Sequence, residues 1–267
     1  MQLKRCIFII FSLFISATTL ADPFIEERNF VVEAKLSILP KIPVMSIDTV
    51  LEIEDNNYEY KFSIRTNNIV DFINKDNPDS AKTVKGNLDI KEDVEKILTD
   101  IDGMFPSLDL LINNASTFYP TPIEEVSEDH WNKLIGSNLK GPLFLIQGVK
   151  EKLKKSNGQV INITDTNLSR GVANYSIYSA AKAGLEAITK GLARELAPEI
   201  KVNAIAPGAM LEPPDVTWTE EQKNKVISSI PLKRMGSEKD IAEAVKFLES
   251  SDYITGQIIK VDGGRSL

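Results

Sequence analysis

A phenol and an ammonium group stand four positions apart at Tyr178 and Lys182, with three small residues between them. On a helix, positions i and i+4 lie on one face, so these two side chains would be neighbours. A nearby ammonium group favours the phenolate and lowers a phenol pKa that starts at about 10. The phenol can then donate or accept a proton near neutral pH, as a general acid or base must. Such a pair also arises by chance on helix surfaces, so the residues around it must indicate whether it is catalytic.

Polar residues recur around this pair where predicted strands and helices end. Asp165 follows the strand 160–164 and lies 13 residues before Tyr178. Three further segments read Asn-Asn-Ala-Ser at 113–116, Ser-Asn-Leu-Lys-Gly at 137–141 and Asn-Ala-Ile-Ala-Pro-Gly at 203–208. In order and spacing these segments resemble the motifs of the short-chain dehydrogenases/reductases over about residues 83–267.

One substitution narrows the resemblance. Most members of that family carry serine where this chain has Asp165. An aspartate there, with the segment 113–122 upstream and the ending 262–267, is similar to the pteridine reductases. The resemblance implies reduction of a dihydropterin, dihydrofolate or related pterin by NADPH, with no metal.

The same resemblance implies roles for the catalytic residues. Tyr178 would donate the proton, while Lys182 would hold the nicotinamide ribose and lower the pKa of Tyr178. Asp165 would orient the phenol and the pterin. Asn138 would stabilise the active-site helix and a proton-relay water.

It also implies binding residues. Phe118 would stack on the pterin ring, although an ordinary core phenylalanine is the alternative, and Arg265 would reach the site of a neighbouring subunit in a homotetramer or homodimer. The predicted substrate contacts are Phe118, Asp165, Tyr178 and Arg265. The predicted cofactor groove is lined by Asn113, Ala115, Ser116, Lys182, Pro207, Gly208 and Met210.

From about residue 83 the pattern alternates between strands and helices, which is typical of an α/β fold with a doubly wound, Rossmann-like parallel sheet. The predicted helices are 92–101, 125–154 in two segments around 138–142, and 176–196. The predicted strands are 108–112, 159–163, 202–205 and 257–261.

The first cofactor-binding unit is not recognisable. All 14 glycines lie at Gly86 or later, whereas a phosphate-binding turn needs glycine so that the backbone can approach the phosphates. That turn is expected near residues 36–45, which contain two prolines and no glycine. Asn87 stands where the family usually has aspartate near the adenine, and no basic residue follows the second strand. We therefore expect an incomplete sheet that lacks its first βαβ unit, an exposed apolar edge on the strand 108–112, and weak or absent NADPH binding.

The N-terminal part has a different sequence pattern from the alternating strands and helices that begin at about residue 83. Residues 1–21 have the charged, apolar and small-residue order of a secretory signal peptide, which predicts export. Residues 22–77 form a β-rich fragment with a strand at 30–39 and an antiparallel hairpin of 49–53 with 58–64, and it weakly resembles the start of an uncharacterised family of secreted bacterial β proteins. Residues 78–267 would be the truncated reductase domain, so the chain reads as a fusion whose export conflicts with cytoplasmic NADPH chemistry.

Composition limits the partners. A net charge of −7 argues against a nucleic-acid surface, and one cysteine and one histidine make a metal site improbable. A signal peptide that is cleaved leaves no stable membrane span. Three functions remain open: a pterin reductase, a non-catalytic exported β protein with a passenger reductase-like tail, and a reductase of another carbonyl substrate.

Overall fold

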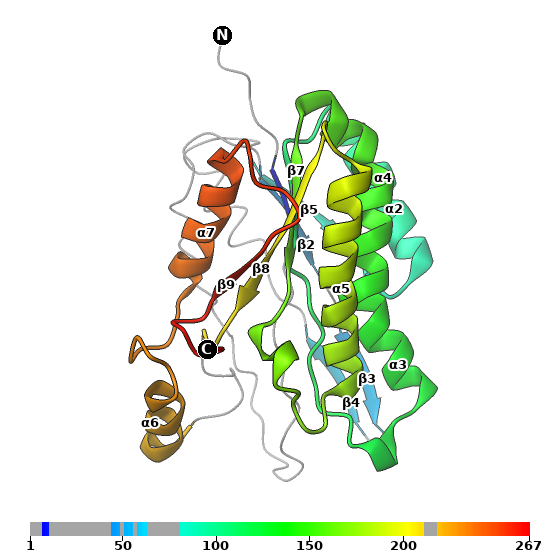
Figure 1. Ribbon diagram of the computed structural model, residues 1–267. Helices are drawn as coiled ribbons and strands as arrows, with labels where there is room; N and C mark the ends of the chain where they lie inside the picture. The colour runs from blue at the N-terminus through cyan, green and yellow to red at the C-terminus, as the bar shows by residue number, and fades with distance from the viewer. Residues whose placement is uncertain (1–6, 11–43, 49–50, 56–57, 63–80, 211–217) are drawn as a thin grey trace.

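The computed structural model describes residues 7–10, 44–48, 51–55, 58–62, 81–210 and 218–267. A parallel sheet of seven strands runs through the molecule in the order β5-β2-β1-β6-β7-β8-β9 (Figure 1). Its strands are β1 (Ile7–Ile10), β2 (Val44–Asp48), β5 (Ala81–Lys85), β6 (Leu110–Asn113), β7 (Gln159–Ile163), β8 (Lys201–Pro207) and β9 (Ile258–Val261). The predicted α/β class and doubly wound parallel sheet are confirmed.

The direction of winding reverses between β1 and β6. The chain passes from β1 through β2 to β5 on one side, and from β6 through β7 and β8 to β9 on the other. In open α/β sheets, ligands bind at the carboxyl ends of the strands beside such a switch point. The residues that follow β6 and β7 are therefore in the right place for chemistry.

Strand β1 corrects the expectation that the first strand is missing. It pairs with β6, with Ile7 opposite Leu110, and with β2 on its other side. The strand at 108–112 therefore has no open edge. The four residues of β1 lie within the predicted signal segment, and an unbroken apolar run suits both a signal peptide and a central parallel strand, so only its pairing partners distinguish the two. The predicted strand at 30–39 and residues 36–43 of the expected turn lie outside the described residues, whereas Val44 and Met45 already belong to β2.

The antiparallel hairpin is confirmed, but its place in the chain differs. Strands β3 (Leu51–Asp55) and β4 (Tyr58–Phe62) pair antiparallel, with Leu51 opposite Phe62. This two-stranded sheet follows β2 and precedes β5 in the chain. It is therefore an insertion between two strands of the large sheet, rather than a segment that comes before that sheet.

Helices cover both faces of the large sheet (Figure 1). Helices α2 (Lys91–Met104), α4 (Gly141–Ser156) and α5 (Ser176–Glu195) lie on one face, and α7 (Glu238–Ser250) lies on the other. The other helical segments of the described residues are η1 (Ile123–Glu125), α3 (Glu128–Ile135), the π-helix η2 (Gly136–Lys140), η3 (Thr166–Ser169) and α6 (Glu220–Ser228). The predicted helices are confirmed, including the division of 125–154, while α6 and α7 were not predicted.

The two cores follow the period-two alternation of the strands. Leu111, Val160 and Val202 pack with α2, α4 and α5, in a cluster that includes Ile97 and Leu145. Other side chains of the same strands point to the opposite face of the sheet. They pack with Leu248 of α7 and are Leu110, Ile112, Ile161, Ile163 and Ile205. Since successive side chains of a strand point to opposite faces, near-continuous apolar strands of this kind fit only a sheet that is covered on both sides.

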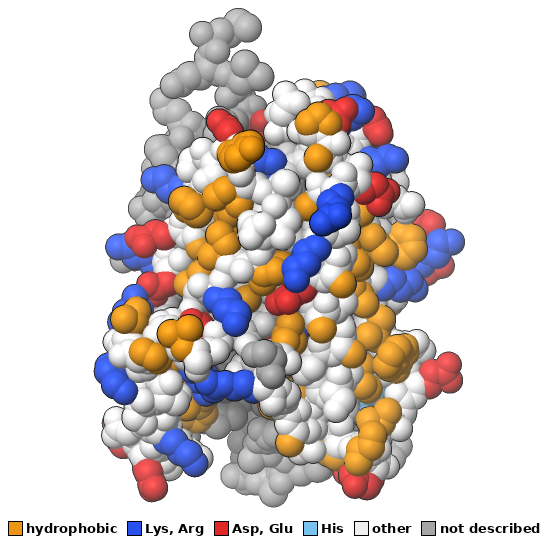
Figure 2. Space-filling view, in the orientation of Figure 1, with side chains coloured by type: hydrophobic (Ala, Val, Ile, Leu, Met, Phe, Trp, Pro, Cys, Tyr) orange, Lys and Arg blue, Asp and Glu red, His pale blue; other side chains and the backbone are white. Residues whose placement is uncertain are grey.

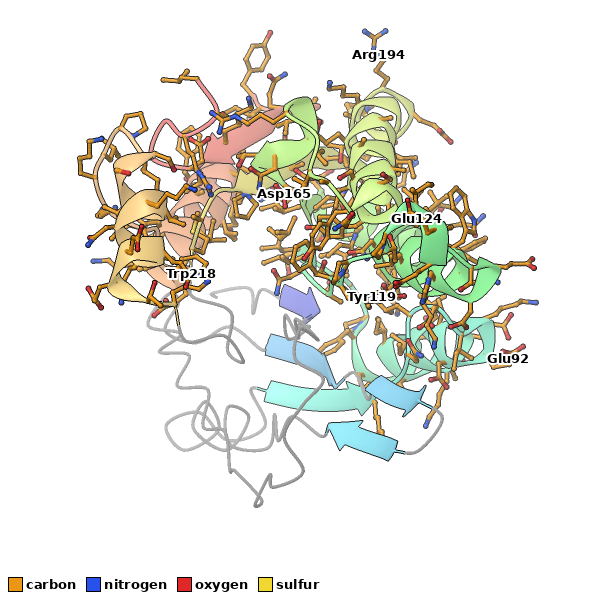
Figure 3. All side chains as sticks on the ribbon, turned by 90° about the horizontal axis from the view of Figure 1, so that it is seen from below. Glu92, Tyr119, Glu124, Asp165, Arg194 and Trp218 are labelled. Carbon is orange, nitrogen blue, oxygen red and sulfur yellow. The ribbon has the colours of Figure 1, made fainter. Side chains whose placement is uncertain are left out.

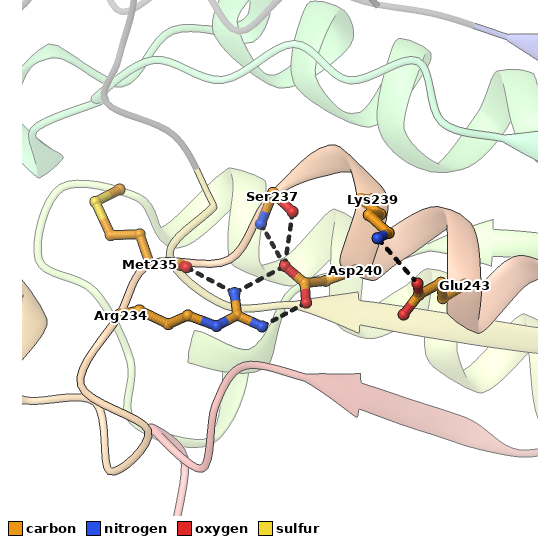
Figure 4. A network of polar contacts seen from close by, with 6 residues as sticks. All are labelled: Arg234, Met235, Ser237, Lys239, Asp240 and Glu243. Atoms are coloured by element: carbon orange, nitrogen blue, oxygen red, sulfur yellow. Dashed lines mark hydrogen bonds and ion pairs between the residues drawn. The ribbon is translucent and has the colours of Figure 1, made fainter. Parts of the chain in front are cut away.

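Local sequence explains where several helices begin and end. Pro142 stands in the first turn of α4, where its missing N–H costs nothing, and Asn157 ends that helix in the left-handed conformation with φ of 50°. At the start of α7, Asp240 accepts hydrogen bonds from the backbone N and Oγ of Ser237 (Figure 4). The Arg234 guanidinium beside it holds the pKa of Asp240 well below its usual range.

The surface seen in Figure 2 mixes charged and apolar side chains. Large apolar residues are exposed on several helices, for example Trp131 of α3, Phe144 of α4 and Phe247 of α7. Among the described residues, no helix combines the length and apolar composition that crossing a bilayer requires.

Candidate active site

The structure brings Tyr178 and Asp165 together. Tyr178 lies in the first turn of α5, is 4% exposed, and donates a hydrogen bond from Oη to Asp165 Oδ2 over 3.1 Å. Asp165, labelled in Figure 3, lies two residues after the end of β7, and its other carboxylate oxygen accepts from the backbone N of Asn167 over 2.7 Å. Because both oxygens of Asp165 are bonded, the carboxylate is held in one orientation beside the phenol.

Lys182 lies one turn further along α5 and is almost completely buried. Its Nζ donates to the backbone oxygen of Ile163 over 2.9 Å and lies 5.9 Å from the centre of the Tyr178 ring. Burial lowers the pKa of Lys182 to about 8, against the opposing attraction of Asp165. A lysine of this kind keeps two donors for a ligand, because an ammonium group has three.

The environment of Tyr178 corrects one expectation about its acidity. Burial, and then the negative charge of Asp165, raise the pKa of Tyr178 well above its ordinary value. The prediction that Lys182 lowers the pKa of Tyr178 is therefore wrong when only the groups of the protein act on the phenol. The physical reason is that removing the phenolate from water and placing it beside a carboxylate both favour the neutral phenol. Tyr178 is accordingly held in its neutral form, with a proton on Oη.

Asn138 lies in the π-helix η2 and is fully buried. Its Nδ2 donates to the backbone oxygens of Thr117 (2.8 Å) and Leu134 (3.0 Å), and its Oδ1 accepts from Ser116 Oγ (2.7 Å). Asn138 therefore joins the helical segment to the loop after β6, and its predicted stabilising role agrees with these bonds. The predicted relay water stays a prediction.

Phe118 lies against Tyr178. Its ring stacks on Tyr175 at 4.5 Å between centroids and 14° between planes, and meets Tyr178 edge-on at 4.8 Å. The backbone N of Thr121 donates to Asn174 O over 2.6 Å and joins the two loops that carry these rings. Phe118 and Tyr175 thus form an aromatic wall beside Tyr178.

Asn113 lies at the carboxyl end of β6, next to the switch point. Its Nδ2 donates to Asn162 Oδ1 (2.8 Å), and Asn162 Nδ2 donates to Thr189 Oγ1 of α5 (2.9 Å). Asn113 is 2% exposed, and its Oδ1 is a buried acceptor with no hydrogen-bond partner among the described residues. A buried unpaired acceptor is costly, so this atom fits a site that a ligand completes.

The other predicted cofactor residues lie around the same end of the sheet. Ala115 and Ser116 are buried after β6. The backbone N of Gly208 donates to Val261 O, and Pro207 O accepts from Thr166 Oγ1, so these two groups already have partners within the protein. Met210 lies against Gly236. A contact of this segment with the nicotinamide amide stays a prediction.

Arg265 lies in the C-terminal segment after β9. Its backbone oxygen accepts from the guanidinium of Arg170, which places the end of the chain against the loop that follows η3. Its predicted reach into a neighbouring subunit stays a prediction.

Sequence reasoning missed several members of this site. Tyr175 is the residue that precedes α5, and its spacing of three from Tyr178 could have placed both rings on one side of the helix. The contacts of Asn162 with Thr189 and of Ser116 with Asn138 join residues 27 and 22 positions apart, for which the chain offers no local signal.

Comparisons with known proteins agree with this geometry. The family described as Enoyl-(Acyl carrier protein) reductase matches residues 63–266. The chain is 36% identical over 185 residues to the 3-oxoacyl-[acyl-carrier-protein] reductase FabG of Staphylococcus epidermidis, covering 68% of this chain and 76% of that protein. It is also 36% identical over 190 residues to FabG of Haemophilus influenzae, covering 70% and 78% of the two chains.

A solved structure, an apo SCOR enzyme from Clostridium thermocellum, superposes with a TM-score of 0.68 at 27% identity, covering 84% of this chain and 82% of that one. The weak resemblance of the N-terminal part to secreted β proteins receives no support from these comparisons. On the catalytic residues, the fold and these relatives, the chain belongs to the short-chain dehydrogenase/reductase family of NAD(P)-dependent oxidoreductases.

Proposed function

We propose that this oxidoreductase reduces a pterin of the dihydropterin or dihydrofolate class with NADPH. The observation that carries the proposal is the bond from Tyr178 to Asp165, next to the aromatic wall of Phe118 and Tyr175. A carboxylate accepts hydrogen bonds and donates none when ionised. It therefore suits a substrate that presents N–H groups, as the amino-pyrimidine edge of a pterin does, and a flat ring suits an aromatic wall.

The residues of the site would act as follows. Asp165 holds the phenol and accepts from the N–H groups of the pterin. Tyr178 donates its Oη proton to the nitrogen of the C=N bond that is reduced. Lys182 uses its two remaining donors, and Asn113 its unpaired Oδ1, to hold the nicotinamide riboside. When bound, the reduced nicotinamide supplies the hydride for the carbon of that bond.

Cofactor affinity is expected to be weak. Because β1 ends at Ile10, a phosphate-binding turn would begin at residue 11, yet the chain has no glycine before Gly86. Residues 11–43 lie outside the described residues, so this expectation rests on composition. A titration of purified protein that shows tight, saturable NADPH binding would contradict it.

A second candidate is reduction of a 3-oxoacyl thioester, because the relatives at 36% identity are named 3-oxoacyl-[acyl-carrier-protein] reductases. Asp165 argues against it. A ketone oxygen offers no hydrogen to a carboxylate and is repelled by its charge as the oxygen becomes negative during reduction.

One pair of variants separates the two candidates. NADPH oxidation is measured at high cofactor concentration with dihydrobiopterin and with an acetoacetyl thioester. Pterin reduction is expected in the unmodified chain, and Asp165→Ser should lower it by a factor of about 100 while leaving or raising thioester reduction. Tyr178→Phe is the control that should abolish both. Thioester turnover without pterin turnover in the unmodified chain would reject the pterin in favour of the second candidate.

Export with cleavage of the predicted signal peptide conflicts with the strand order of the large sheet. Cleavage after residue 21 would remove β1 from between β2 and β6. We therefore propose that the folded reductase keeps this segment and works where NADPH is present, in the cytoplasm.

A further inference from the structure

Ser116 lies between two groups of the active site. It is 2% exposed, its Oγ lies 2.7 Å from Asn138 Oδ1, and its side chain lies within hydrogen-bonding reach of the phenol of Tyr178. A serine hydroxyl has one proton to donate and two lone pairs that accept. Which neighbour receives that proton therefore matters for the chemistry of Tyr178.

In the resting site, the hydrogen bonds of Asn138 determine which neighbour accepts the Ser116 proton. Asn138 Nδ2 faces the backbone oxygens of Thr117 and Leu134, which can only accept. The amide therefore cannot be turned over, and Asn138 Oδ1 must face Ser116 as an acceptor. Ser116 donates its proton to Asn138, and the neutral phenol of Tyr178 donates its own to Asp165.

Proton transfer changes what Tyr178 needs. When the Oη–H bond breaks and the proton passes to the substrate, while the hydride from the reduced nicotinamide completes the two-electron reduction, Tyr178 is left as a phenolate. Asp165, as a carboxylate, has no proton with which to bond it. A hydrogen bond to an ionised group is roughly twice as strong as one between neutral groups, so the Ser116 hydroxyl gains by turning from Asn138 to the phenolate.

We propose that Ser116 is a catalytic residue whose hydroxyl rotates from Asn138 to Tyr178 as the phenolate forms. It keeps its own proton throughout, and the phenolate later regains a proton from solvent. The alternative is that Ser116 only holds the loop against Asn138.

The test needs neither cofactor nor substrate, so it is independent of the proposed pterin reduction. A single 3,5-difluorotyrosine is incorporated at position 178, and its ionisation is followed by fluorine NMR. Ser116→Ala should raise the titration midpoint by about one pH unit, a tenfold loss of phenolate stability. The matched control is Ser137→Ala, which removes another buried hydroxyl in contact with Asn138, bonded to Thr117. It should leave the midpoint unchanged.

An unchanged midpoint in Ser116→Ala, with the same thermal unfolding as the parent, overturns the proposal, and so does an equal shift in Ser137→Ala. If Ser116→Ala does not fold, Ser116→Cys keeps the side-chain shape with a weaker donor. A rise of its midpoint supports the proposal, and an unchanged midpoint refutes it.

Discussion

Lys182 places an ammonium group in the core, and the free-energy cost of doing so can be measured. The side chain is 2% exposed, and burial lowers its pKa from 10.5 to about 8. One pKa unit corresponds to about 1.4 kcal/mol of difference between the two protonation states. The charged form in the folded protein therefore costs roughly 3 kcal/mol relative to the unfolded chain.

The sign of the pH dependence follows from the direction of the shift. Between pH 8 and pH 10.5 the unfolded chain binds a proton at Lys182 that the folded chain has lost, so this residue makes stability rise with pH. The penalty is fully present below the folded pKa of about 8 and is relieved as the pH rises to the unfolded value.

Lys182→Met removes this titration. It also leaves the backbone oxygen of Ile163 without its donor, at a cost of about 1–3 kcal/mol that does not depend on pH. The difference in unfolding free energy between variant and parent should therefore move by roughly 3 kcal/mol between pH 7 and pH 10.5, in the direction that favours the variant at pH 7.

Urea unfolding of both proteins at several pH values measures this change. Lys190→Met alters an exposed lysine of the same helix and should give a difference that stays constant with pH. A Lys182→Met difference that is equally constant would refute the reasoning, because it would mean that burial does not disfavour the ammonium group.

Three further changes test the fold. Asn162→Ala should lower the unfolding free energy by about 2 kcal/mol, because it leaves the buried amide of Asn113 without an acceptor, and urea unfolding measures this loss. Deleting residues 1–10 should abolish cooperative thermal unfolding, since β1 lies between β2 and β6; a folded deletion variant would show that the sheet does not need this strand. Gly208→Ala should cost about 1–3 kcal/mol in the same urea assay, because the new Cβ would lie 2.7 Å from the Asp262 backbone; an unchanged midpoint would contradict that packing.

The grouping of the candidate catalytic residues could be predicted because their signals are local. Tyr178 and Lys182 meet through the spacing of one helix, and Asp165 follows a strand that is apolar throughout. The order of strands and helices from α2 to β8 was readable for the same reason, since periodicity is a property of neighbouring residues. The family and the pairing of Tyr178 with Lys182 and Asp165 were therefore determined by the sequence itself.

Contacts between distant segments were decided only by the tertiary structure. The apolar run at Ile7–Ile10 has no periodicity that separates a signal peptide from a central strand, and its pairing with β6 joins residues about a hundred positions apart. The raised pKa of Tyr178 depends on how completely the folded chain excludes water around it. The bond from Ser116 to Asn138 likewise exists only because the sheet and the π-helix bring two loops together. Helical spacing places a phenol and a lysine side by side, but burial and partners from other segments determine when that phenol gives up its proton.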